Sequence, residues 1–201
     1  MPAPRIVFMP GVGADPEFWK PVGDRLPAAW DKVYLGWPGL GDQPSDPSVS
    51  GWDDLLRLTL EAVGPGTADL VAQSMGGFLA LAATLRHPRR VRRLVLTATS
   101  GGIDVGSLGA AEWRATHRAA RPNAPAWIYQ QLPDLAPRIG DIRSPTLLIW
   151  GDQDPLSPVA VGRRLADLLP SAALRIVVGG DHALALARAA EIAPWIEAHL
   201  A

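Results

Sequence analysis

The sequence contains no cysteine. This absence excludes disulfide bonds, thiol nucleophiles and metal sites built from cysteine, although it says little about the cellular compartment. Lysine is also scarce, with 2 lysines beside 17 arginines, which we interpret as a coding bias. The formal net charge of −1 gives no reason to expect a nucleic acid or another polyanion as a partner.

Long apolar runs are absent as well. No stretch approaches the roughly 18–20 apolar residues of a membrane-spanning helix, so we expect no membrane span. The segment Met1 to Arg5 leads directly into a strand-like run and does not resemble a secretory signal, which makes a cytoplasmic protein the default expectation. A phosphate-binding loop and histidines at metal-ligand spacing are both lacking, so the sequence predicts no cofactor and no metal.

Short runs rich in Val, Ile and Leu alternate with longer segments of helical apolar spacing. The runs are nearly continuous, which is typical of parallel strands covered on both faces. The expected strands are Ile6–Met9, Lys32–Leu35, Ala68–Ala72, Val91–Ala98, Thr146–Trp150 and Leu174–Val178. The expected helices are Pro16–Arg25, Trp52–Ala62, Gly76–Arg86, Val159–Leu169 and Ala183–His199. This alternation predicts an α/β fold, a three-layer αβα sandwich around a mostly parallel sheet of about six strands.

The 201 residues are expected to form one domain over residues 1–201. Within it, residues 101–142 break the alternation and are too long for an ordinary connection. Several prolines and aromatic side chains occur there, with short helices expected around Ala110–Ala120 and Ala126–Leu132. We predict a small cap or lid insertion over one end of the sheet.

Ser74 lies at the most informative point of the chain. It ends an apolar run, and small residues stand two positions before it (Ala72) and two after it (Gly76). A helix-compatible segment follows at once. This pattern predicts a nucleophile elbow, a sharp strand-to-helix turn that exposes a serine hydroxyl and leaves little room for Cβ atoms. A serine is a weak nucleophile unless a base activates it.

His182 is the best candidate for that base. It follows the last expected strand in a glycine turn, Gly179-Gly180-Asp181-His182, and therefore shares the carboxyl edge of the sheet with Ser74. The other histidines lie elsewhere: His87 in a turn that ends a helix, His117 in the insertion and His199 on a helix near the C-terminus. A histidine that caps a helix is the structural alternative for His182.

A carboxylate should orient the imidazole of His182. Asp154 and Asp152 both follow the strand Thr146–Trp150, and we choose Asp154, with Asp152 as the fallback. Turn and helix-cap chemistry is the structural alternative for both residues. Asp181 is a poor candidate because its neighbour His182 would have to fold back on it.

An oxyanion site needs two backbone N–H groups. Met75 follows the nucleophile at a helix N-terminus, where free donors and the helix dipole favour an anion. Val12, in the glycine loop after the first strand, is assigned the second N–H group. A dinucleotide-binding interpretation of Gly11-Val12-Gly13 is weak, because the third glycine is missing.

The sequence has one basic cluster, and its members are Arg86, Arg89, Arg90, Arg92 and Arg93. We interpret it as a solvated helix end and the loop before a strand. An anion-docking patch is the alternative.

With Ser74, Asp154 and His182 in that chain order, the sequence resembles the α/β-hydrolase superfamily over nearly its whole length. The matching segments are Pro10–Gly13 followed by Phe18-Trp19, Trp37–Ser45, Gln73–Gly77, Gly151–Pro158 and Gly180–His182. Two departures stand out: Pro10 replaces the histidine that is common in the oxyanion loop, and Ala72 replaces the usual glycine before the nucleophile. The resemblance implies a trimmed member of about six strands with a reduced cap.

The resemblance implies a carboxylesterase-like serine hydrolase that works without a cofactor on a small-molecule ester or related acyl substrate. The pocket walls are expected to include Trp37, Ile103, Trp113, Trp127 and Leu156. The same three residues also serve carbon–carbon bond hydrolases, lyases and cofactor-free perhydrolases. A non-catalytic ligand receptor is a further alternative, because a fold does not guarantee a function. The oligomeric state is left open.

Overall fold

The computed structural model describes residues 4–201. Residues 1–3, which belong to the segment inspected for a signal sequence, lie outside the described residues. The centre is a six-stranded sheet in which every pair of neighbours is parallel, with the order β2-β1-β3-β4-β5-β6. The strands are β1 (Arg5–Met9), β2 (Asp31–Tyr34), β3 (Ala68–Gln73), β4 (Val91–Thr97), β5 (Thr146–Gly151) and β6 (Ala172–Val177). The predicted α/β fold with about six strands is confirmed.

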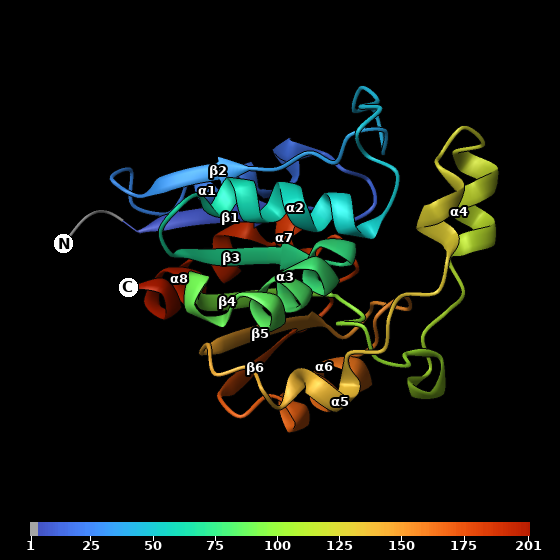
Figure 1. Cartoon of the computed structure of the whole chain (residues 1–201). Coiled ribbons are helices and arrows are strands. Elements are labelled where there is room, and N and C mark those ends of the chain that lie inside the picture. Colours follow the sequence, from blue (N-terminus) through green and yellow to red (C-terminus); the bar gives the residue numbers. More distant parts are fainter. Residues whose placement is uncertain (1–3) are drawn as a thin grey trace.

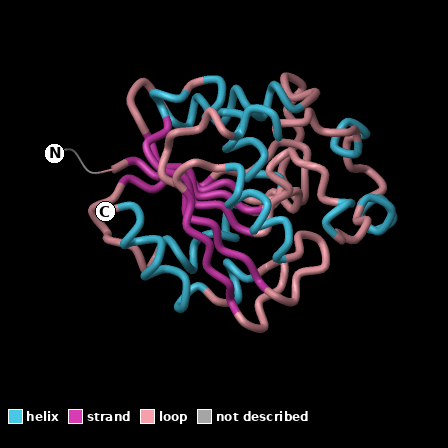
Figure 2. Tube along the Cα trace, turned by 90° about the horizontal axis from the view of Figure 1, so that it is seen from below, coloured by secondary structure: helices cyan, strands magenta, loops and turns pink. Residues whose placement is uncertain are grey.

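Helices cover both faces of this sheet, which gives the three predicted layers (Figure 2). One face carries α2 (Trp52–Val63), α3 (Met75–Arg86) and α6 (Val159–Leu168). The other face carries α1 (Lys20–Gly23), α7 (Leu184–Ala187) and α8 (Ala189–Leu200), together with the short 3-10 helix η1 (Pro16–Trp19). A further 3-10 turn, η2 (Pro88–Arg90), leads into β4.

The core consists of two apolar layers that share the strands. Successive side chains of a strand point to opposite faces, so Val7 and Met9 of β1 join the α2/α3 layer while Ile6 and Phe8 join the α1/α8 layer. All four are fully buried. Both faces of the central strands therefore need apolar residues, which explains why their sequences do not alternate with polar ones.

The two edge strands depart from that expectation. β2 is half-buried or exposed along its length, and β6 alternates between half-buried and exposed residues before the buried Val177. Ile176 in β6 is 37% exposed, and Val178 just beyond it is 76% exposed. An edge strand has only one neighbour and is covered less completely, so the expectation of two covered faces is right for the central strands and wrong for these two.

Two of the predicted helices are divided in the structure. The segment expected as one helix over 16–25 consists of η1 followed by α1, and the C-terminal helix is split into α7 and α8. The break falls at Arg188, whose backbone angles of φ −115° and ψ 27° are not helical. Its side chain donates to Val178 O and to Glu191, which ties the break to the end of β6.

The segment 101–142 connects β4 to β5 through short elements only. They are η3 (Gly106–Leu108), α4 (Arg114–Ala120), η4 (Ala126–Tyr129) and α5 (Ala136–Ile139). In Figure 1, α4 stands apart from the helices of the sandwich, beyond the carboxyl ends of the strands and opposite both termini. Over residues 4–201, no helix combines the length and the apolar character needed to cross a membrane.

Candidate active site

The topology of the sheet selects the place for a site. Because all strands are parallel, the loops after their carboxyl ends meet at one edge. The chain adds β2 on one side of β1 and then crosses to place β3 on the other side. The order of the strands thus reverses between β1 and β3, and ligands of open α/β sheets bind at such a switch point. Ser74 directly follows β3 there.

Ser74 has a backbone conformation that only a supported turn maintains. Its φ is 51° and its ψ is −119°, in a region that L-residues other than glycine rarely adopt. Such a conformation costs about 1–3 kcal/mol and persists only where neighbours enforce it. Here the Ser74 amide donates to Thr97 O at 3.0 Å, and the Thr99 hydroxyl donates to Ser74 O at 2.6 Å.

The glycines after Ser74 allow close packing of the turn. A Cβ atom at Gly76 would lie 2.6 Å from Met9 O, and one at Gly77 would lie 2.5 Å from the Thr99 side chain. Contacts this short exclude any larger residue without a shift of the backbone. α3 can therefore begin directly beneath the serine, with Met75 as its first residue.

The structure brings His182 and Asp154 to Ser74. His182 Nε2 lies 3.1 Å from Ser74 Oγ, and His182 Nδ1 lies 2.8 Å from Asp154 Oδ2. An ionised carboxylate can only accept, so Nδ1 carries the proton and Nε2 is the free acceptor for the serine hydroxyl. The Asp154 side chain is fully buried, whereas that of His182 is 28% exposed. The imidazole therefore lies between a buried carboxylate and the hydroxyl of the half-buried Ser74.

The three aspartates near His182 have different contacts. Asp154 Oδ1 accepts from the amides of Leu156 and Ser157 at 2.8 and 3.1 Å, which leaves Oδ2 free for the imidazole. Asp152, the fallback, accepts instead from the Gly179 amide at 2.7 Å and joins the two loops. Asp181 accepts from the amide of Ala183, as in an ordinary turn. Of the three, Asp154 is the aspartate hydrogen-bonded to the imidazole.

The loop after β1 lies against the serine. A Cβ atom at Gly11 would lie 3.0 Å from Ser74 Cβ. Two buried indoles hold the start of this loop, since Trp19 Nε1 donates to Met9 O at 3.1 Å and Trp37 Nε1 donates to Pro10 O at 2.9 Å. Trp37 was expected in a pocket wall, but it is fully buried and supports the loop from within the core. That expectation is corrected.

Sequence reasoning missed two buried hydroxyl residues that connect the site. Ser157 Oγ donates to Thr99 O and accepts from the indole of Trp150. Because Thr99 also binds Ser74 O, this chain of hydrogen bonds links the loop of Asp154 to the turn of the serine. The signal was present for Thr99, a hydroxyl residue just beyond the carboxyl end of β4.

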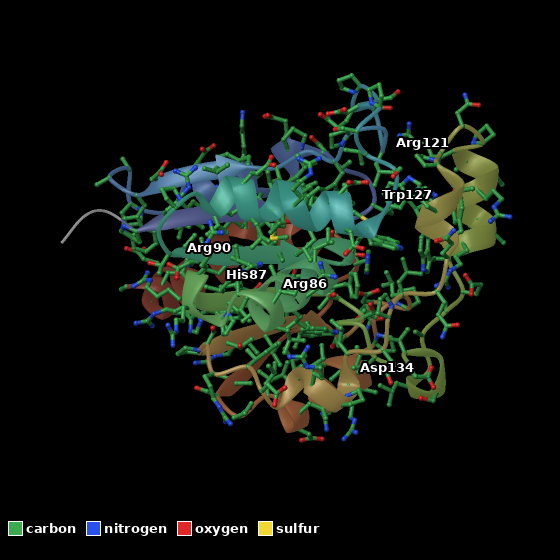
Figure 3. The ribbon with its side chains drawn as sticks, in the orientation of Figure 1. Arg86, His87, Arg90, Arg121, Trp127 and Asp134 are labelled. Carbon is green, nitrogen blue, oxygen red and sulfur yellow. The ribbon has the colours of Figure 1, made fainter. Side chains whose placement is uncertain are left out.

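The other expected pocket residues, Ile103, Trp113, Trp127 and Leu156, are all half-buried. Trp127 packs edge-on against Trp52 of α2 at 5.2 Å between ring centroids, and Figure 3 shows it between α2 and α4. Trp113 instead joins His117 and Tyr129 in an aromatic cluster within the insertion. Their contact with a substrate stays a prediction.

A cavity of about 420 Å³ lies between the loop 39–45 and the segment 117–124. Arg121 and Asp42 join its two sides by an exposed ion pair of 2.7 Å, and Figure 3 shows Arg121 between that loop and α4. His117 also lines the cavity. Burial, followed by the nearby charge of Arg121, lowers the pKa of His117 and favours its neutral form.

Four arginines of the basic cluster, Arg86, Arg90, Arg92 and Arg93, make contacts within the chain. Arg86 pairs with Asp53, Arg92 pairs with the buried Asp69, and Arg93 donates to His199 O. Figure 3 shows Arg86, His87 and Arg90 together at the end of α3, away from Arg121 and Trp127. These pairings favour the structural interpretation of the cluster over an anion-docking patch. Among the described residues, no group of three or more His, Asp or Glu side chains is arranged to hold a metal ion.

A family model described as the alpha/beta hydrolase fold matches residues 4–138 and 127–189. The chain belongs to the α/β-hydrolase family. Together the two matches cover most of the sequence and include the loop after β1, the serine turn and the segments of Asp154 and His182.

Named relatives in this family include enzymes of two kinds. A pimeloyl-(acyl-carrier protein) methyl ester esterase of Aromatoleum aromaticum is 29% identical, with 98% of each chain covered. A 2-hydroxy-6-oxononadienedioate/2-hydroxy-6-oxononatrienedioate hydrolase of Burkholderia vietnamiensis is 26% identical over 83% of this chain and 75% of that protein. The esterase alignment has 249 positions, more than the 201 residues here, so the relative carries segments that this chain lacks.

Solved structures show the same fold. An alpha/beta hydrolase from the metagenome of sediments of the Mar Chica lagoon, Morocco, superposes with a TM-score of 0.80 at 22% identity. The match covers 98% of this chain and 90% of that one. At this identity the similarity shows the fold alone.

Proposed function

We propose that this protein is a serine hydrolase that cleaves carboxylic esters through a Ser74–His182–Asp154 triad. The observation that carries the proposal is the continuous hydrogen-bond chain from Asp154 through His182 to Ser74, with distances of 2.8 and 3.1 Å. A buried carboxylate, an oriented imidazole and a strained, partly exposed serine are the parts that acyl transfer requires.

In this mechanism, Ser74 Oγ attacks the ester carbonyl while His182 Nε2 accepts the hydroxyl proton. Asp154 keeps the Nδ1 proton in place and stabilises the imidazolium that forms. The imidazolium then donates its Nε2 proton to the departing alcohol, which leaves an acyl group on Ser74. A water molecule, deprotonated by His182, attacks this acyl-enzyme and releases the carboxylic acid.

The oxyanion of each tetrahedral intermediate is stabilised by the amides of Val12 and Met75. Met75 begins a helix of 12 residues, so its amide lies at the positive end of the helix dipole. Val12 follows Gly11, which packs against Ser74. Among hydrogen bonds of turns and loops within residues 4–201, neither amide has a protein acceptor, which leaves both available to an oxyanion.

An apolar acyl group suits the surroundings best. The expected pocket residues Ile103, Trp127 and Leu156 are apolar and half-buried, so they retain surface that a substrate can cover. The esterase relative from Aromatoleum aromaticum supports an ester as the substrate class. We propose residues 101–142 as the cap that shapes access to Ser74.

Carbon–carbon bond hydrolysis is the second candidate. It is favoured by the Burkholderia vietnamiensis relative, whose name denotes a hydrolase of 2-hydroxy-6-oxononadienedioate and 2-hydroxy-6-oxononatrienedioate. Product analysis separates the two candidates. An ester yields an acid and an alcohol, whereas the substrate of a carbon–carbon bond hydrolase is split into two fragments at a carbon–carbon bond.

The first test is to compare the wild type with Ser74→Ala, using short and medium p-nitrophenyl esters and a fluorophosphonate probe. Ser171→Ala, at an exposed position, is the matched control. We expect turnover and labelling in the wild type and the control, and neither in Ser74→Ala. A folded wild type that neither turns over esters nor reacts with the probe contradicts the proposal. Labelling without ester turnover favours the carbon–carbon hydrolase.

A further inference from the structure

Gln73 is a buried polar residue directly before the serine. It ends β3 and is only 5% exposed. Buried polar side chains are retained where their hydrogen bonds are used, and Gln73 takes no part in the proposed chemistry. Its side chain instead contacts two loops that come from other strands.

The first contact is with the loop that carries the base. Gln73 Nε2 donates to the main-chain oxygen of His182 at 3.1 Å. Because β4 and β5 separate β3 from β6, the loop after β6 must cross the ends of two strands before His182 reaches Ser74. Within residues 4–201, Gln73 is the one hydrogen-bond donor to His182 O. The main chain of the base is thus tied directly to the strand of the nucleophile.

The second contact is with the loop after β1. A Cβ atom at Gly11 would lie 2.5 Å from Gln73 Oε1, so the amide group of Gln73 lies close to Gly11 and occupies the space that a side chain there would need. The parallel register, in which Met9 pairs with Ala72, brings these positions side by side. A single side chain therefore spans the loop before Val12, the serine turn and the loop of His182.

We propose that Gln73 is a positioning residue that sets the distance between His182 and Ser74. Asp154 controls the rotation of the imidazole through Nδ1, whereas Gln73 controls where the main chain of His182 lies. Both constraints are needed for Nε2 to remain 3.1 Å from Ser74 Oγ. This inference rests on the proposed function, and Gln73 itself touches neither the substrate nor the reacting atoms.

The test is Gln73→Met, which keeps the length of the side chain and removes the donor. A displacement of a catalytic group by about 1 Å can cost about 100-fold in rate, so we expect kcat and the fluorophosphonate labelling rate to fall by about 10- to 100-fold. KM should stay within about threefold, because the substrate site is not touched. Glu197→Met, at an exposed position of α8, is the control and should match the wild type.

Gln73→Glu serves as the second variant, in case Gln73→Met does not fold. Its carboxylate has nearly the same size but accepts where the glutamine donates, so it should lower kcat to a similar extent. Circular dichroism and thermal unfolding confirm the fold of each variant, and the rates are measured well below the unfolding temperature.

A double-mutant cycle separates positioning from a general loss of structure. In an Asp154→Asn background the imidazole is already in a tautomer that cannot accept the Ser74 proton, so Gln73→Met should lower the residual rate by less than about threefold. The inference is overturned if kcat stays within twofold of the wild type in both folded Gln73 variants. It is also overturned if Gln73→Met lowers kcat by the same factor in the Asp154→Asn background as in the wild type. A wild type without labelling or turnover contradicts the proposed function instead, which keeps the two failures distinct.

Discussion

Asp154 allows the proposed mechanism to be tested without loss of the fold. In Asp154→Asn, the amide oxygen can still accept from the amides of Leu156 and Ser157, as Asp154 Oδ1 does. The amide NH2 then replaces Oδ2 beside His182 Nδ1, 2.8 Å away. Because NH2 is a donor, the imidazole must accept at Nδ1 and carry its proton on Nε2. Nε2 can then no longer take the proton of Ser74.

The expected loss follows from this change of tautomer. The corresponding aspartate-to-asparagine change in a serine protease lowers kcat by about 10⁴. At about 1.36 kcal/mol per tenfold, the activation free energy rises by about 5.4 kcal/mol. The free energy of unfolding should change much less in Asp154→Asn than in Asp154→Ala. The alanine variant leaves two backbone donors without a partner and should be about 2–4 kcal/mol less stable than the asparagine variant.

The assays are p-nitrophenyl ester turnover near pH 8 and urea denaturation of the same samples. Asp152→Asn is the matched control, since an asparagine there can still accept from the Gly179 amide and does not face the imidazole. Its kcat should stay within about threefold of the wild type. The reasoning is refuted if Asp154→Asn retains a tenth of the wild-type kcat, or if Asp152→Asn loses more activity than Asp154→Asn.

Three further predictions concern stability and the support of the site. Burial lowers the pKa of the half-buried His199, so the unfolded chain binds protons more readily and stability should fall as the pH drops below about 6.5. His199→Gln should reduce this fall, measured as the change in urea midpoint between about pH 7.5 and 5. If the urea midpoint changes equally with pH in His199→Gln and in the exposed His87→Gln, this explanation is contradicted. Gly77→Ala places a Cβ atom 2.5 Å from the Thr99 side chain and should lower both Tm and kcat. Gly66→Ala, the control, meets no atom within 4 Å and should be neutral. Matching melting curves for the two variants argue against a close contact between Gly77 and Thr99. Trp37→Phe leaves Pro10 O without its indole donor and should lower the free energy of unfolding by about 1–3 kcal/mol and reduce kcat, so an unchanged kcat speaks against a role in the loop after β1.

The central strands and the serine turn could be predicted from the sequence because their causes are local. Apolar residues on both faces of β1, β3, β4 and β5 indicate buried parallel strands. Small residues around Ser74 indicate the tight turn, and the structure shows the contacts that require Gly76. The edge strands were less predictable, since β2 and β6 have apolar residues like the others but lack a second neighbour.

The choice among candidate residues depended on distances between loops from different strands. Asp152 and Asp154 are equivalent in local sequence, and the packing of the loops after β5 and β6 decides that Asp154 contacts His182. Trp37 looked like a pocket residue, yet the closure of the core places it beneath the loop after β1.

By itself, the sequence determined the α/β class, the position of the strained serine and the order Ser74, Asp154, His182, because each follows from periodicity or from a motif a few residues long. Only the tertiary structure decided which carboxylate contacts the imidazole and which parts of the site Thr99 and Gln73 connect by hydrogen bonds. The physical reason is that hydrogen bonds act over about 3 Å, while Gln73 and His182 are 109 residues apart in the chain and meet only once the sheet has formed.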